Sequence, residues 1–256
     1  MTAAIVIANL TSFAKPISSS VYSKLLESEK RNYLNENLSH LFYFIIPLAA
    51  LSITFAKPGL SALNPLYEIA VPVAIFMTLR ILLFSLSEVF VQFLRGIEKV
   101  DLKPESTFKD FIKSKLFSLS TIRIIHGGLY LAILAIILVL ERNTVSQLEL
   151  VTHWSIISLV TTIPFTVYLY LMVKKNFELS LDIFRILKFL LVSIGVFGGV
   201  YFLSEEFLEY NDNIFEFLPN LLIFVIMGII GYLGLTYVID SGTRKLFNAI
   251  IGEVKK

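Results

Sequence analysis

The hydrophobic pattern divides the chain into six long apolar segments separated by short polar ones. Each is close to or above the roughly 20 residues that a helix needs to cross a bilayer. We therefore predict six transmembrane helices, at residues 38–56, 67–94, 116–140, 148–173, 183–203 and 215–239. The links between them are too short to hold a soluble catalytic domain. The pattern predicts an all-α, polytopic membrane protein whose helices carry the function, and no enzymatic activity is expected.

Shorter segments flank this predicted six-helix lobe, which covers residues 38–240. Residues 1–37 are predicted to hold the end of a preceding helix, because the apolar run Ala3–Ala14 is too short to span, followed by an amphipathic cytoplasmic linker. Residues 241–256 are predicted to form an amphipathic cytoplasmic helix, since their apolar side chains recur at helical spacing. Both end segments suit the membrane interface. Lys57-Pro58-Gly59 is expected to end the first span.

Composition supports the membrane class and excludes several kinds of chemistry. The chain is 56% hydrophobic, whereas ordinary globular domains are about 45–50% apolar. Cysteine is absent, which excludes disulfides, thiolate metal sites and cysteine nucleophiles. The three histidines are scattered without metal-ligand spacing. No metal, cofactor or nucleic-acid partner is expected.

The distribution of basic residues predicts the orientation. Of the 22 Lys and Arg residues, sixteen lie in the two end segments and in the second-to-third and fourth-to-fifth links, and Arg185 and Lys188 lie in the first two turns of the fifth span, next to the fourth-to-fifth link. Only Lys57 and Arg142 lie in the links on the opposite side. Basic links remain on the cytoplasmic side of a membrane. The chain is therefore predicted to be a multi-pass protein of the cell membrane with both termini in the cytoplasm.

The two remaining cations, Arg80 and Arg123, lie inside predicted spans. A cation at the bilayer centre costs about 2.5–3.5 kcal/mol on insertion scales, so intramembrane arginines usually serve a function. Arginine donates two parallel hydrogen bonds to a phosphate and stays charged at any cellular pH. Arg80 and Arg123 are thus candidate ligands of an anionic headgroup. The alternatives are that Arg80 pairs with another helix as a structural cation and that Arg123 extends to the lipid headgroups.

Glu88 and His126 are candidates for ion or proton coupling. Glu88 lies two turns beyond Arg80 and could bind a proton or a cation, or pair with Arg95 or Lys99 near the cytoplasmic surface. His126 follows Arg123 by three residues, which places both on one face of a helix. Its imidazole could titrate near neutral pH, or it could be a packing residue beside Gly127 and Gly128.

Several short motifs, taken in order, resemble a known family. They are Phe13-Ala14-Lys15-Pro16-Ile17-Ser18 before a charged segment, Tyr43–Ala49 with its proline, Leu63–Ala70, Phe93–Gly96 and the tail Arg244–Phe247. In this order, over nearly the full length, they resemble the C-terminal half of a Wzx-type polysaccharide flippase. That family belongs to the multidrug/oligosaccharidyl-lipid/polysaccharide exporter superfamily.

The resemblance implies a fold of two six-helix lobes around a central cavity. Such proteins are held to move a polyprenyl-diphosphate-linked oligosaccharide to the outer leaflet by alternating access. Cationic cavity residues would hold the diphosphate, and Arg80 and Arg123 are the ones placed to do so here. The sequence departs from the family in length, because it contains only the tail of the first lobe. The expected partners are therefore the lipid-linked oligosaccharide, membrane lipid and an N-terminal six-helix lobe in the same chain or a separate subunit.

Two other functions remain open at this point. One is a multidrug antiporter of the same superfamily, although the basic cytoplasmic rim and Arg80 suit an anionic lipid better than a cationic drug. The other is a non-transporting membrane scaffold subunit of a glycan-assembly complex. A membrane-embedded glycosyltransferase is less favoured, because the acidic group Glu205–Asp212 falls on the predicted outer side, away from nucleotide-sugar donors.

Overall fold

A computed structural model describes residues 1–14, 32–96, 107–141, 143–176, 179, 181–211 and 213–254. Within those ranges every regular element is helical. The elements are α1 (Thr2–Ala8), η1 (Asn9–Ala14), α3 (Asn32–Thr54), α4 (Ala56–Leu63), η2 (Pro65–Ala70), α5 (Val71–Gly96), α6 (Phe108–Lys113), α7 (Lys115–Glu141), α8 (Gln147–Asn176), α9 (Ile183–Phe207), α10 (Ile214–Ile239) and α11 (Ser241–Val254).

Six of the described helices are long and apolar enough to cross a membrane: α3, α5, α7, α8, α9 and α10. Their bounds lie within about four residues of the predicted spans, except that α3 begins six residues before the predicted start. The all-α, six-span prediction is confirmed at this level. The division into a transporter lobe and the interfacial position of the end segments stay predictions.

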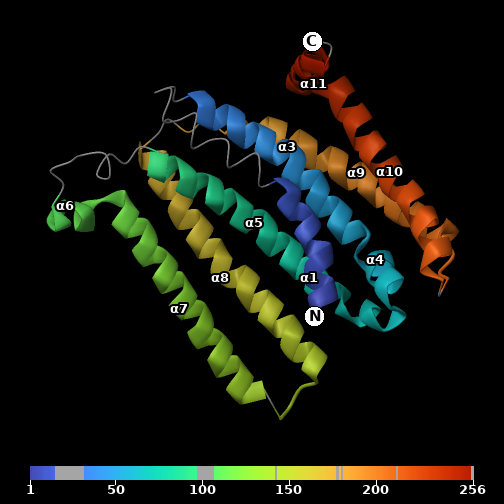
Figure 1. The fold of residues 1–256 in the computed structure, drawn as a ribbon, viewed down its shortest axis with the longest axis horizontal. Helices are drawn as coiled ribbons and strands as arrows, with labels where there is room; N and C mark the ends of the chain where they lie inside the picture. Colours follow the sequence, from blue (N-terminus) through green and yellow to red (C-terminus); the bar gives the residue numbers. More distant parts are fainter. Residues whose placement is uncertain are drawn as a thin grey trace.

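The long helices run up and down in a bundle that is wider than it is deep (Figure 1). Helices α3, α5 and α8 form its centre, with α7 on one side and α9 and α10 on the other. Helices α5 and α8 run in the same direction and make the most extensive helix contact. Helix α11 lies at one end of the bundle, and α4 and η2 lie at the other (Figure 1).

Two buried apolar clusters hold the bundle together. The larger cluster joins α3, α5, α8, α9 and α10, and its largest fully buried side chains include Phe90, Phe93, Phe189, Phe197 and Phe217. The smaller cluster lies near α4 and η2, where Ala4 and Ala8 of α1 pack against the first half of α5. In both clusters dispersion contacts, not exclusion from lipid, favour the association of apolar helices in a membrane.

The N-terminal apolar run is too short to span, as predicted, and packs one face against the bundle. Ala4 and Ala8 have no solvent exposure, and Ile7 packs against Gly59 of α4. A Cβ at Gly59 would come within 2.9 Å of the Ile7 Cδ1 atom, so a larger residue there would displace the end of the Ile7 side chain. The start of α1 consequently lies near α4 and η2, at the end of the bundle opposite α11 (Figure 1).

Two sequence expectations need correction or fall outside the described residues. Lys57-Pro58-Gly59 does not stop helical structure; α3 ends at Thr54, and the tripeptide lies in the first turn of α4. Proline is tolerated in a first turn because its missing N–H would have no intrahelical partner. The predicted amphipathic linker falls mainly on residues 15–31, outside the described ranges, and residues 32–37 already belong to α3.

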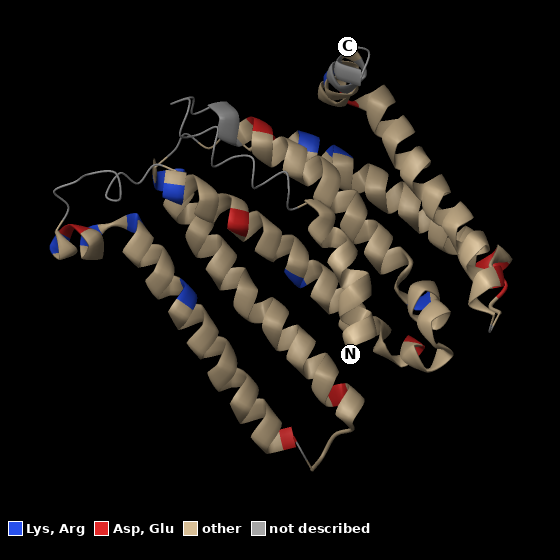
Figure 2. Cartoon of the chain, viewed as in Figure 1, with Lys and Arg blue, Asp and Glu red and all other residues tan. Residues whose placement is uncertain are grey.

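Charged residues gather at the ends of the long helices, and charged turns inside α5 and α7 interrupt otherwise uncharged ribbon (Figure 2). Large apolar side chains are exposed along α7, α9 and α10. Exposed apolar surface of this extent belongs in a lipid environment, not in water. The structure is thus that of a multi-pass membrane protein, while the identity of the membrane and the orientation of the termini stay predictions.

Candidate functional site

Arg80 lies at the middle of the apolar span Pro65–Gly96. Ser87 returns to within about 20° of Arg80 around the helix, and its hydroxyl lies 2.7 Å from that of Thr166 on α8. The face of α5 that carries Arg80 is therefore directed toward α8. Because the two helices run in the same direction, Arg80 lies about level with Leu159, which precedes Thr166 by as many residues as Arg80 precedes Ser87.

The Arg80 guanidinium lacks a counter-ion. No acidic side chain in the described ranges forms an ion pair with it, and its buried Nε has no hydrogen-bond partner among those residues. The guanidinium carbon lies 5.8 Å from the centre of the Phe84 ring, a cation–π distance. An unpaired guanidinium in a membrane is costly, so this group is suited to receive an anion.

His126 brings α7 to the same region. Its ring stacks on Phe165 of α8 with 4.7 Å between ring centres, and it lies within hydrogen-bonding reach of the Thr161 backbone. It is also close enough to Arg80 for the two side chains to interact electrostatically. Its buried Nε2 has no partner in the part of the chain that the structure describes. Arg80 and His126 thus each offer a nitrogen to the space between α5, α7 and α8.

Glu88 and Arg123 form an ion pair between α5 and α7. Arg123 Nη2 donates to Glu88 Oε1 at 2.6 Å, and the two side chains are 38% and 26% exposed, respectively. Of the two structural partners that the sequence suggested for Glu88, Arg95 forms no ion pair with it in the described ranges, and Lys99 lies outside those ranges. The Arg123 guanidinium is bound to the Glu88 carboxylate.

Helix α8 lines this region with a row of buried hydroxyls. Its members recur at helical spacing and are Ser155, Ser158, Thr161, Thr162 and Thr166. Ser155, Thr161, Thr162 and Thr166 each donate to a backbone carbonyl three or four residues earlier, as in Thr162 to Ser158 O at 2.7 Å. Such hydroxyls satisfy themselves within the helix and still have lone pairs to accept from a neighbouring cation.

All four residues singled out in the sequence thus meet on α5 and α7 beside α8. Arg80 and His126 are near each other, and Glu88 and Arg123 are paired. Whether these residues bind a substrate or an ion stays a prediction. The α8 hydroxyls were missed, although their spacing of three to four residues in an apolar span was a usable signal. Groups of three or more potential metal-ligating His, Asp or Glu side chains do not occur in the described ranges.

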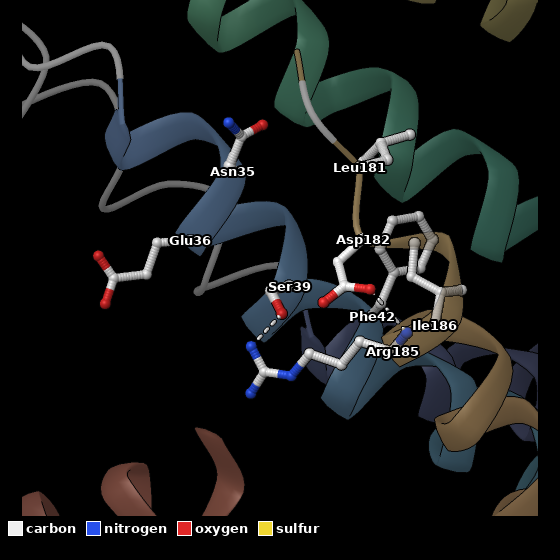
Figure 3. A pocket seen from close by; sticks show the side chains of 8 residues that line it. All are labelled: Asn35, Glu36, Ser39, Phe42, Leu181, Asp182, Arg185 and Ile186. Atoms are coloured by element: carbon white, nitrogen blue, oxygen red, sulfur yellow. Dashed lines mark hydrogen bonds between the residues drawn. The ribbon is translucent and has the colours of Figure 1, made fainter. Parts of the chain in front are cut away.

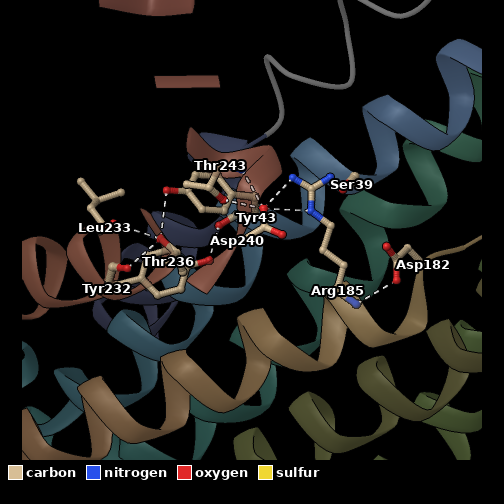
Figure 4. Close-up of polar contacts among 9 residues, drawn as sticks. All are labelled: Ser39, Tyr43, Asp182, Arg185, Tyr232, Leu233, Thr236, Asp240 and Thr243. Atoms are coloured by element: carbon tan, nitrogen blue, oxygen red, sulfur yellow. Dashed lines mark hydrogen bonds and ion pairs between the residues drawn. The ribbon is translucent and has the colours of Figure 1, made fainter. Parts of the chain in front are cut away.

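A second polar cluster, which we call the Arg185 cluster, joins α3, α9 and α11 at the end of the bundle (Figure 4). Arg185 donates from Nε and Nη2 to Asp240 Oδ2, at 3.1 and 2.9 Å, and from Nη1 to Ser39 Oγ at 2.7 Å. Thr243 donates to the same carboxylate oxygen from its backbone N–H and hydroxyl. A Cβ at Gly242 would lie 2.1 Å from Arg185 Nη2, so the guanidinium packs directly on that backbone.

Asp240 is buried, with 7% of its side chain exposed. Burial disfavours its charged form, but the hydrogen bonds from the Thr243 backbone and from Arg185 outweigh that effect and hold the pKa of the carboxyl below its ordinary value. Sequence analysis missed the Arg185–Asp240 pair. The two residues are 55 positions apart, and each alone resembles an ordinary charge at the end of a span.

A pocket of about 260 Å³ lies beside the Arg185 cluster, between the starts of α3 and α9 (Figure 3). Its lining combines Glu36 and Asp182 with Arg185, whose side chain extends past the pocket to Ser39. Asp182 is already engaged, because its side chain accepts from the Arg185 backbone N–H and caps α9. Because Arg185 and Asp182 are already engaged, this pocket is a weaker candidate site than the region around Arg80.

Comparison with known proteins gave no match to any family model, to any curated protein or to any solved structure.

Proposed function

We propose that this chain is one lobe of a membrane transporter that moves a polyprenyl-diphosphate-linked oligosaccharide across the cell membrane, in the synthesis of an envelope polysaccharide. The observation that carries the proposal is the Arg80 guanidinium, which lies at mid-span without a counter-ion in the described ranges. An anion that visits the membrane interior would compensate this charge. A diphosphate matches the planar fork of arginine, and its lipid tail would remain among apolar helices.

The surroundings of Arg80 support a binding role over a purely structural one. A structural cation is expected to have its partner in place, as Arg185 does with Asp240. Arg80 instead has a buried Nε without a partner in the described ranges and a neighbouring imidazole whose Nε2 is also unpartnered there. Arg80 would bind the diphosphate. His126, whose other ring nitrogen is within reach of the Thr161 backbone, would donate a further hydrogen bond from Nε2 as the imidazolium, the form that a bound anion favours.

Transport by alternating access would require a second six-helix lobe, in the same chain or in a separate subunit. In the single bundle Arg80 would contact the anion from one side. A second lobe facing it would enclose the anion and exclude water from it. This arrangement follows the resemblance to the exporter superfamily and is part of the proposal.

The proposal is tested by measuring binding of polyprenyl diphosphate to the purified chain in lipid nanodiscs, with polyprenol of the same length as the uncharged reference. We expect the diphosphate to bind more tightly. Arg80→Ala should weaken its binding by about tenfold or more, because charge-assisted hydrogen bonds contribute about 1.5–3 kcal/mol. Arg80→Lys should retain part of the affinity, since it keeps the charge and loses the planar fork.

Lys57→Ala is the matched control, because it removes a cation from α4 at the far end of the bundle. It should leave binding unchanged. Equal affinity for diphosphate and polyprenol, or an Arg80→Ala variant that inserts and binds as the wild type does, would overturn the proposal.

A multidrug antiporter is the second candidate, and the intramembrane carboxylate of Glu88 favours it. Cation-coupled efflux needs an acidic group within the membrane that binds a proton or metal ion. In that case a lipophilic cation would bind to the chain more tightly than polyprenyl diphosphate does, and Glu88→Gln would abolish its binding. The ion pair of Glu88 with Arg123 argues against this role, because the carboxylate is already neutralised.

A further inference from the structure

The ion pair of Glu88 with Arg123 is a single-point contact between two helices. Only one guanidinium nitrogen of Arg123 meets one carboxylate oxygen, at 2.6 Å. A bidentate pair would hold the geometry more firmly. Both side chains remain partly exposed, at 38% and 26%, so another acceptor can reach the guanidinium.

Helix α7, which contributes Arg123, is loosely held. Leu119 alone is buried within this fully described helix. Its main neighbour is α8, and its contact with α5 is slight. A helix with so little buried surface can move relative to α5 at small energetic cost. The polar contact between Glu88 and Arg123 is therefore a substantial part of what joins α7 to α5.

The pair lies next to the nitrogen donors already described. Arg123 and His126 are three residues apart and share a face of α7, and His126 is in electrostatic range of Arg80. An anion bound between Arg80 and His126 would thus be near Arg123. Phosphate oxygens carry more charge than one carboxylate and accept the same hydrogen bonds. They would compete with Glu88 for the Arg123 guanidinium.

We infer that Glu88 is an internal counter-ion that the anionic substrate replaces on Arg123, and that the released carboxylate then takes up a proton. This inference rests on the proposed function. Arg123 exchanges a carboxylate oxygen for a phosphate oxygen, and one proton from the water on the open side of the site converts Glu88 to the neutral acid. When the substrate leaves, Arg123 pairs with Glu88 again and the proton returns to water.

Proton uptake follows from the location of Glu88. An ionised carboxylate without a partner is strongly disfavoured inside a membrane, and it becomes neutral instead. Because Glu88 becomes neutral, the complex carries one negative charge fewer than the substrate and the empty site carry together. A smaller net charge lowers the desolvation that the anion undergoes on its passage.

Other titratable groups on the helices around Glu88 must be separated from its effect. They include Arg80 and Arg95 on α5, Arg123 and His126 on α7, His153, Tyr168 and Tyr170 on α8, and His40 and Tyr43 on α3. Free histidine has a pKa near neutral pH, as does the terminal phosphate of the substrate. The histidines and the phosphate all remain in a Glu88→Gln variant, so the difference between that variant and the wild type isolates Glu88.

The experiment measures the affinity of the chain in nanodiscs for polyprenyl diphosphate between about pH 5 and pH 8. If binding takes up one proton at Glu88, the wild-type affinity should rise by up to tenfold for each unit by which the pH falls. This increase adds to any pH dependence from the histidines and the substrate phosphate, which the wild type and the variant share. Glu88→Gln should bind more tightly than the wild type at pH 8. The slope of its log affinity against pH should be smaller than that of the wild type by up to one, which corresponds to one proton fewer taken up on binding. Glu205→Gln, which removes the carboxylate of the exposed pair with Lys57, is the control and should match the wild type.

The outcomes separate this inference from the proposed function. If the diphosphate binds through Arg80 but Glu88→Gln shows the wild-type pH dependence, or binds less tightly at pH 8, the counter-ion exchange is wrong and the transporter proposal stands. If the wild type does not prefer the diphosphate over polyprenol, both fail. A Glu88→Gln chain that retains preferential binding with the reduced slope supports both.

Discussion

At the scale of single residues, Asp240 makes the stability of the chain depend on pH. Its pKa is lowered in the folded state, so its stabilising contribution is fully present above the unfolded value of about 3.9 and is lost as the pH falls through the folded value. We expect the melting temperature of the wild type to exceed that of Asp240→Asn above about pH 5. The difference should shrink below about pH 4, as thermal unfolding in detergent would measure.

Asp182→Asn is the control for this prediction. Asp182 caps α9 with a single backbone hydrogen bond and takes no part in the pair with Asp240. If Asp240→Asn lowered the melting temperature by the same amount at every pH, the effect would come from the geometry of the amide and not from the loss of the carboxylate charge.

The residues of the candidate site could be selected from the sequence, but their partners could not. An ionisable residue inside an apolar span stands out in the sequence whatever its side chain contacts. Sequence analysis selected Arg80, Glu88, Arg123 and His126 for this reason. The pairing of Glu88 with Arg123 depends on how α5 and α7 are rotated, which a hydropathy pattern does not specify. Sequence analysis left open a proton or cation site at Glu88 and considered only Arg95 and Lys99 as pairing partners, because sequence reasoning favours neighbours close along the chain.

At the scale of helices, Pro47 removes the N–H that would bond the carbonyl of Tyr43 within α3. The hydroxyl of Tyr232, on α10, donates to that carbonyl at 2.8 Å. One helix thus satisfies a backbone group that another leaves open, as polar side chains do around kinks in membrane helices. The packing of α3 against α10 therefore depends on this proline.

We expect Tyr232→Phe to destabilise the chain by about 1–3 kcal/mol, because the Tyr43 carbonyl is then buried without a partner. In a Pro47→Ala background the alanine N–H can bond the same carbonyl, so the same change should cost clearly less. Unfolding of the four chains of this double-mutant cycle gives the coupling energy. If the losses in free energy of unfolding of the two single variants summed to that of the double variant, the Tyr232 hydroxyl and Pro47 would be acting separately.

Helix positions were the most predictable part of the fold, since the thickness of a bilayer restricts span length and every span had polar residues at its ends. The short elements were less predictable. Gly59 and Pro58 indicate a break in most contexts, yet here they lie in the first turn of α4, where Gly59 packs closely against Ile7. Such a contact between residues 7 and 59 depends on tertiary packing, and no local pattern encodes it.

At the scale of the whole molecule, the orientation in the membrane can be measured directly, because the chain has no cysteine. The predicted orientation places the α7–α8 connection outside and α6 inside. We expect a single cysteine introduced as Ser146→Cys to react with a membrane-impermeant maleimide in intact cells. Lys109→Cys should react only after the cells are opened.

The two variants serve as controls for each other, since both positions are exposed. The reverse labelling pattern would show that the predicted topology is inverted. It would then place the Arg185 cluster outside, and with it the end of the bundle that is predicted to face the cytoplasm.

The loose attachment of α7 also has a consequence for how the sequence can vary. Most side chains of this helix are not buried by other helices, so substitutions there need preserve little beyond hydrophobicity, whereas α5 is packed on several sides and its side chains must fit their neighbours. In a saturation mutagenesis experiment α7 should tolerate nearly any apolar residue, apart from the positions of Arg123 and His126. Those two positions would then remain as isolated points of intolerance in an otherwise permissive helix.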